Sequence, residues 1–192
     1  MFSIYETRSD REKLLNNLLE QDPTLALIVA FIDFEWTVRR TILALGKSST
    51  KVIRARYAGE NPETGQKDCN RRAVCSLDGF NELWNQEVAS GSARKFYDFF
   101  NNAVKLRNVP GFNKDLAAAS GKKNRNTADY LKIVYERFRN TLIHGSRTTV
   151  KPDKARFAFH FVTACSRALC DYAEEQGKSI YGKKIVRIKP RQ

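Results

Sequence analysis

Three polar residues near the end of one candidate helix have the types that phosphodiester chemistry uses. They are Arg139, Asn140 and His144 in the string R-N-T-L-I-H-G. A histidine with a pKa near its ordinary value of about 6.5 can take a proton from a ribose 2′-hydroxyl or return one to a leaving 5′-oxygen. An arginine offers a permanent charge and a planar fork to phosphate oxygens. Together with the asparagine amide, which can orient either group, these side chains suit RNA cleavage without a metal ion.

The apolar pattern around these residues predicts a helix from Thr127 to His144. At about 100° per residue, five side chains form one apolar stripe that predicts a core face, namely Leu131, Val134, Tyr135, Phe138 and Leu142. Asn140 and His144 lie one turn apart on the other side, with Arg139 beside them. Gly145 follows where a C-terminal glycine belongs. The pattern therefore predicts that an arginine, an amide and an imidazole project together from a helix anchored by its apolar side.

The same residues also have a purely structural interpretation. Arginine and histidine are favoured near a helix C-terminus because they complement the helix dipole and bind free carbonyl groups. From spacing alone, the catalytic and the capping interpretations both stay open.

In its helical setting, R-N-T-L-I-H-G resembles the signature of the HEPN superfamily (higher eukaryotes and prokaryotes nucleotide-binding). In that family, an arginine, a following polar residue and a histidine a few positions later end the third core helix of an α-helical bundle. The resemblance implies a metal-independent endoribonuclease in which Arg139 stabilises the phosphate, Asn140 orients the phosphate or the base, and His144 transfers protons. The products would be a 2′,3′-cyclic phosphate and a 5′-hydroxyl.

The resemblance also implies partners. HEPN nucleases act as homodimers with a composite active site, which would supply the second acid-base group that one motif lacks. Many are toxins or antiviral-defence effectors that are paired with an antitoxin or inhibitor protein. The alternative is a non-catalytic HEPN module that binds RNA or regulates a partner.

An earlier helix offers a supporting pair of side chains. Glu35 and Arg39 are four residues apart, so they lie on one face of a helix. HEPN nucleases often carry an acidic or polar residue on an earlier helix that faces the motif, and Glu35 is the candidate for it here. The alternative is an ordinary ion pair between Glu35 and Arg39 within the helix.

Basic residues outside the motif are candidates for RNA contacts. The chain has 34 Lys and Arg against 21 Asp and Glu, a net charge of +13, which favours a polyanionic partner. The candidates for phosphate contacts are Arg137, Lys122, Lys123, Lys183 and Lys184, and Arg40 extends the same basic rim. Alternatively, these residues only form a charged surface exposed to solvent, and those in the tail belong to a mobile chain end. His160 lies in an aromatic cluster and is predicted to be a packed core histidine.

Periodicity along the whole chain predicts an all-α fold, an HEPN-like helical bundle. A single domain is expected over residues 1–180, with an inserted basic loop region at 46–78 and a basic tail at 181–192. Within the insertion, Val52–Tyr57 is predicted to be a short extended segment. Helices are predicted at 9–21, 24–45, 80–88, 92–106, 127–144 and 153–177.

Composition bounds the remaining possibilities. Hydrophobic residues make up 42% of the 192 residues, enough for a substantial core. No apolar run approaches the roughly 20 residues of a membrane span, and residues 1–10 lack the features of a signal peptide. The sequence therefore predicts a cytoplasmic protein with reduced cysteines. Cysteine spacing fits no zinc motif, and no nucleotide-binding glycine loop occurs, so neither a metal nor an organic cofactor is expected.

Overall fold

The computed structural model describes residues 7–67, 73–89, 94–112, 126–145 and 149–181. Helices make up most of these residues, and no β-strand occurs among them. The only β-type pairing in the described segments is an isolated bridge between Glu60 and Lys67. The predicted all-α class is therefore confirmed.

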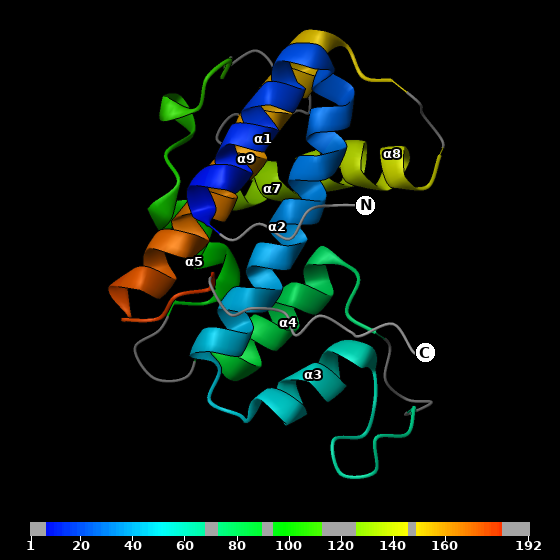
Figure 1. Cartoon of the computed structure of the whole chain (residues 1–192), viewed down its shortest axis with the longest axis vertical. Coiled ribbons are helices and arrows are strands. Elements are labelled where there is room, and N and C mark those ends of the chain that lie inside the picture. The colour runs from blue at the N-terminus through cyan, green and yellow to red at the C-terminus, as the bar shows by residue number, and fades with distance from the viewer. Residues whose placement is uncertain (1–6, 68–72, 90–93, 113–125, 146–148, 182–192) are drawn as a thin grey trace, which may run out of the picture.

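Ten helical segments follow one another in the described parts of the chain (Figure 1). They are α1 (Arg8–Gln21), α2 (Pro23–Leu45), α3 (Thr50–Ala58), α4 (Leu77–Glu87), α5 (Phe96–Ala103), η1 (Leu106–Asn108), α7 (Thr127–Val134), η2 (Tyr135–Asn140), α8 (Thr141–Ile143) and α9 (Pro152–Glu175). The predicted helix at 153–177 agrees closely with α9. The one predicted at 92–106 was too long, because α5 begins only at Phe96 and ends at Ala103.

The long helices α1, α2 and α9 lie side by side and form the centre of the molecule (Figure 1). Asp22 begins α2 by accepting hydrogen bonds from the backbone N–H groups of Thr24 and Leu25, and Pro23 occupies the first turn. Buried aromatic side chains fill the space between the helices: Phe31, Phe34, Phe80, Trp84, Phe96, Phe100, Phe159 and Phe161. This core fixes the position of α2, which carries Glu35.

Residues 52–57 were predicted to be extended, and this prediction was wrong because they belong to α3. Ser49 caps α3 by accepting a hydrogen bond from the N–H of Val52, and Gly59 ends it with a φ of 70°. Ile53 is completely buried in the main core. Tertiary burial of this side chain outweighs the weak extended preference of β-branched residues.

A buried carboxylate ties α3 to α4. Glu87 is 1% exposed and accepts hydrogen bonds from the backbone N–H and the hydroxyl of Ser48, each at 3.0 Å, and it pairs with Arg56. Because a buried charge needs several partners, these contacts fix the segment after α2 against the end of α4.

The helix predicted at 127–144 has the right extent but changes its winding. Its residues form α7, then the π-helical segment η2, and finally the short α8. Asn126 caps the helix directly before its predicted start at Thr127, and it forms a reciprocal capping box with Asp129. Gly145 has a φ of 71° directly after the last helical residues, as predicted. Among the described helices, none is long and apolar enough to cross a membrane.

Candidate functional site

The π-helical turn η2 decides where the motif side chains point. In a continuous α-helix, Arg139 would lie about 140° around the axis from buried Val134, and His144 about 80°. With about 4.4 residues per turn in η2, these angles become about 50° for Arg139 and about 170° for His144. The turn therefore rotates Arg139 toward the interior and His144 toward solvent.

Arg139 is held by Glu35, which reaches it from the middle of α2. Arg139 Nε donates to Glu35 Oε1 at 2.9 Å, and the two side chains are only 12% and 15% exposed. The phenol of Tyr135 donates to the same oxygen. The guanidinium carbon lies 5.2 Å from the centroid of the Tyr135 ring. Glu35, Tyr135 and Arg139 thus form one connected cluster between η2 and α2.

The terminal nitrogens of Arg139 are held less firmly than Nε. Nη1 lies 3.4 Å from Asn140 Oδ1, and Nη2 lies 3.4 Å from the carbonyl oxygen of Cys75. Both distances exceed the usual range of about 2.7–3.2 Å for N–H···O bonds. An anionic oxygen could replace either contact at a shorter distance.

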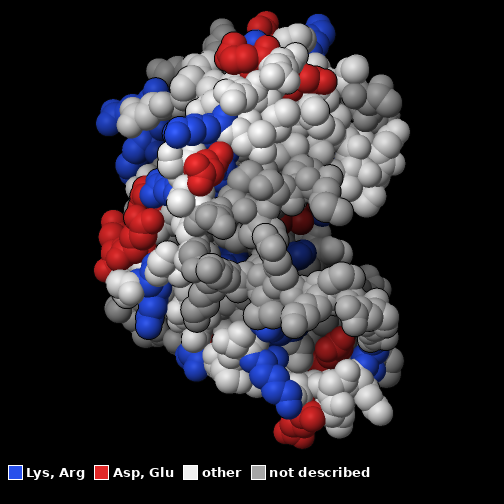
Figure 2. All heavy atoms as spheres, viewed as in Figure 1, with Lys and Arg blue, Asp and Glu red and all other residues white. Residues whose placement is uncertain are grey.

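The molecular surface is hollowed near this cluster. Figure 2 shows a notch in the flank of the molecule, beside the part that holds α8, with acidic and basic atoms inside it. Arg139 contacts both Glu35 of α2 and Cys75, which lies just before α4. The Arg139 cluster therefore lies between α2 and the segment that leads into α4.

The protonation of the cluster follows from its burial and its charges. Burial raises the pKa of the Tyr135 phenol, and the contact with Glu35 raises it further. Burial would lower the pKa of the Arg139 guanidinium, but Tyr135 and Glu35 outweigh this effect, and the net pKa is raised. Tyr135 therefore remains a hydrogen-bond donor and Arg139 a cation at neutral pH.

Among the described residues no hydrogen bond or ion pair joins His144 to Arg139, so the prediction that the arginine, the amide and the imidazole serve one site stays a prediction. The histidine is exposed, at the end of α8, and its side chain has no hydrogen bond or ion pair with the described residues. Asn140 remains next to Arg139 through its Oδ1 atom. By helix geometry, the directions of Arg139 and His144 differ by about 140° in a continuous α-helix and by about 120° with the π turn, so the turn changes where both side chains point but hardly changes the angle between them.

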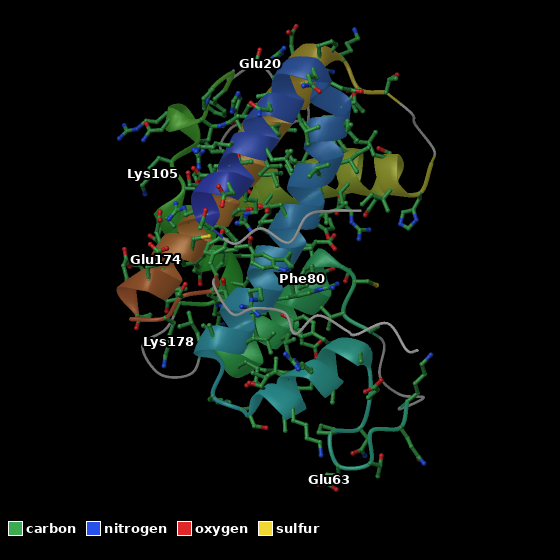
Figure 3. All side chains as sticks on the ribbon, viewed as in Figure 1. Glu20, Glu63, Phe80, Lys105, Glu174 and Lys178 are labelled. Atoms are coloured by element: carbon green, nitrogen blue, oxygen red, sulfur yellow. The ribbon has the colours of Figure 1, made fainter. Side chains whose placement is uncertain are left out.

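The predicted pair of Glu35 with Arg39 is not formed, because Arg139 and Tyr135 occupy the Glu35 carboxylate. Arg39 donates to the carbonyl of Val74 at 3.4 Å, and its guanidinium lies 5.7 Å from the Tyr57 ring and 5.8 Å from the Phe80 ring. Figure 3 labels Phe80 on α4, close to α2. Arg39 and Arg139 thus contact two consecutive carbonyl groups of the segment before α4.

Of the other basic candidates, the two that the structure describes have no hydrogen bond or ion pair with this cluster. Arg137 is exposed on η2, and Arg40 is engaged elsewhere, donating to the carbonyl of Ile180 at 3.0 Å. Four candidates lie outside the described residues: Lys122, Lys123, Lys183 and Lys184. His160 is half-buried and lies edge-on to Phe159; burial and two arginines of α9 lower its pKa.

The sequence analysis missed one member of the cluster, Tyr135, and one neighbour that contacts Arg139, Cys75. Tyr135 was predicted to be only a core residue, although its spacing of four from Arg139 indicates a shared helix face. Cys75 contributes a backbone carbonyl, which no side-chain pattern can reveal. Within the described residues, Cys75, Cys165 and Cys170 are free thiols, and no group of three metal-binding side chains occurs.

Comparisons with protein families, with curated proteins and with solved structures give no match for this chain. The residues of the Arg139 cluster and their geometry are therefore the basis for a functional proposal.

Proposed function

We propose that this chain is a metal-independent endoribonuclease of the HEPN type that acts as a toxin or phage-defence effector in the cytoplasm. The observation that carries the proposal is the anchoring of Arg139. Glu35 binds its Nε, while its terminal nitrogens have only long contacts near a surface notch. An arginine held in this way is prepared to bind a phosphodiester group.

Cleavage would proceed by attack of the ribose 2′-oxygen on the adjacent phosphorus. The bond from phosphorus to the 5′-oxygen breaks, which leaves a 2′,3′-cyclic phosphate and a 5′-hydroxyl. Arg139 stabilises the charge that grows on the non-bridging oxygens, and Asn140 orients the phosphate or the base. His144 takes the proton from the 2′-hydroxyl or gives one to the 5′-oxygen, and a second group performs the other transfer.

A second copy of the chain is the proposed source of that second group. One motif offers a single imidazole, that of the exposed His144, so the second proton transfer needs a further acid-base group. One side of α2 exposes Leu25, Ile32 and Trp36, which are 44%, 44% and 37% exposed and recur at spacings that place them on one face. By helix geometry, Ile32 and Trp36 point about 60° and 100° away from Glu35, so a second copy on this face would lie beside the site.

The exposed position of His144 at the end of α8, with no described side-chain contact, also favours a second candidate function. The alternative is a module that only binds RNA or regulates a partner protein, for example an antitoxin or inhibitor. In such a module, Arg139 and His144 would not act together in catalysis. His144 would then merely complement the end of α8. RNA binding that weakens steeply with salt and does not change in His144→Ala would fit this alternative.

Cleavage of a mixed RNA substrate in EDTA tests the proposal. The wild type should leave 2′,3′-cyclic phosphates, while folded His144→Ala and Arg139→Ala proteins should lose nearly all activity. The chain has only two histidines, so His160→Ala is the matched control and should remain active. Wild-type protein that binds RNA without cutting it would support the binding module. Cleavage that survives in both motif variants would place the active site elsewhere.

The second copy is tested by the mass of the protein in solution. The wild type should be a dimer by light scattering, and Ile32→Glu should make it monomeric and inactive while its circular dichroism stays unchanged. A wild-type monomer that cleaves RNA would contradict the composite site.

A further inference from the structure

Tyr135 lies under the guanidinium of Arg139 and links it to Glu35. Its ring contacts the guanidinium at 5.2 Å, and its phenol donates to Glu35 Oε1, the same oxygen that accepts from Arg139 Nε. Tyr135 is only 3% exposed, and the fully buried Phe31 holds its ring edge-on at a centroid distance of 5.8 Å. The tyrosine is therefore a fixed part of the interior that extends into the candidate site.

This arrangement determines which edge of Arg139 stays available. A guanidinium is planar and has five N–H donors in a rigid fork. Because Nε is bound to Glu35 and the face is packed on Tyr135, the edge formed by Nη1 and Nη2 is the part of the guanidinium that remains for an anion. Their contacts to Asn140 and Cys75 are the long ones, at 3.4 Å. The donors best suited to two phosphate oxygens are thus the least satisfied ones.

The phenol also completes the hydrogen bonding of the carboxylate. Glu35 is largely buried, and a buried carboxylate is costly unless several donors satisfy it. Tyr135 and Arg139 supply two donors to one oxygen. Without the phenol, Arg139 would be the single described donor to Glu35. Its guanidinium could then shift along the carboxylate, because no second hydrogen bond would fix the carboxylate oxygen.

We infer that Tyr135 is the positioning residue of this site, holding Glu35 and Arg139 so that Nη1 and Nη2 of Arg139 face a phosphodiester. The inference rests on the proposed function, because the phosphodiester is the substrate group of that function. Tyr135 itself does not touch RNA and acts only through Arg139 and Glu35.

Tyr135→Phe tests this role because it keeps the ring and removes the phenol. Tyr57→Phe is the matched control, since it removes another buried phenol, whose hydroxyl has no hydrogen-bond partner among the described residues and whose ring lies next to Arg39 instead. The first measurement is the Nε–H signal of Arg139 in a ¹⁵N NMR spectrum, assigned by its loss in Arg139→Lys. The second is the single-turnover rate of RNA cleavage, together with the Kd for a 2′-deoxy-substituted oligonucleotide that cannot be cut.

In Tyr135→Phe, the Arg139 Nε–H signal should move and exchange faster with solvent, whereas Tyr57→Phe should leave it unchanged. The cleavage rate should fall about tenfold, as expected for loss of a hydrogen bond to a charged group, with less than about a twofold change in Kd. An unchanged Nε–H signal would overturn the positioning role, whatever the activity. A changed signal with an unchanged cleavage rate would show that the positioning of Arg139 by Tyr135 does not matter for cleavage. If the signal moves but the wild type cleaves no RNA, the proposed function fails while the positioning of Arg139 by Tyr135 stands.

Discussion

Replacement of Glu35 by glutamine isolates the negative charge at the centre of the Arg139 cluster. Glutamine has nearly the same shape and keeps an oxygen that can accept hydrogen bonds, so it removes the charge and little else. The wild-type carboxylate accepts from Tyr135 and from Arg139 Nε, in a place where both members of the ion pair are at most 15% exposed. The change therefore converts two charge-assisted hydrogen bonds into neutral ones and leaves Arg139 without its counter-ion.

The expected loss of stability follows from these two bonds. A hydrogen bond to a charged group contributes about 1 kcal/mol more than a neutral one, so Glu35→Gln should lower the free energy of unfolding by about 2 kcal/mol. For a chain of this length, that corresponds to a decrease in Tm of about 4–8 °C. Thermal and urea unfolding followed by circular dichroism measure both quantities.

Glu20→Gln is the matched control for this experiment. Glu20 pairs with Arg156 at 3.7 Å, but the two side chains are 77% and 41% exposed. Solvent screens such a pair, so its loss should cost less than about 0.5 kcal/mol. Equal small effects of Glu35→Gln and Glu20→Gln would refute the conclusion that Glu35 and Arg139 form a buried, mutually dependent pair.

Three further predictions test other parts of the structure. Gly46→Ala should cost about 1–3 kcal/mol in urea unfolding, because a Cβ there would lie 2.5 Å from Ile53 Cδ1. His160 has a lowered pKa through burial and two arginines of α9, so the native state binds fewer protons than the unfolded one, and stability should fall as the pH drops through about 6.5. The difference in unfolding free energy between pH 7 and pH 5 should therefore shrink in His160→Gln, and an unchanged difference would contradict this. Under native conditions, iodoacetamide should label the exposed Cys75 before the buried Cys165, whose thiol pKa is raised by burial, and peptide mass mapping would detect the opposite order.

Apolar periodicity was sufficient to predict most of the helical structure. The stripe that begins at Leu131 and ends at Leu142 is buried or partly buried as predicted, because a side-chain repeat of three and four residues has only one helical face to occupy. The start of α2 after Asp22 and the turn at Gly145 also follow from local rules, since caps and left-handed glycines act on their own neighbours. The candidates Arg139 and Asn140 came from their residue types and from the resemblance of R-N-T-L-I-H-G to the HEPN signature, and Glu35 came from that resemblance alone.

The tertiary structure decided how those residues meet. Helical spacing offered Glu35 a partner in Arg39, but the fold presents Tyr135 and Arg139 to it from another helix, and they occupy the carboxylate instead. The π turn at Tyr135–Asn140, which changes the directions of Arg139 and His144, interrupts the continuous α-helix that the apolar repeat predicts. Similarly, residues 52–57 were predicted to be extended, but they belong to the helix α3, in which Ile53 is buried in the core. The sequence by itself therefore determined which side chains could do chemistry, and only the tertiary structure decided their partners, because contacts between helices compete with the neighbours that spacing suggests.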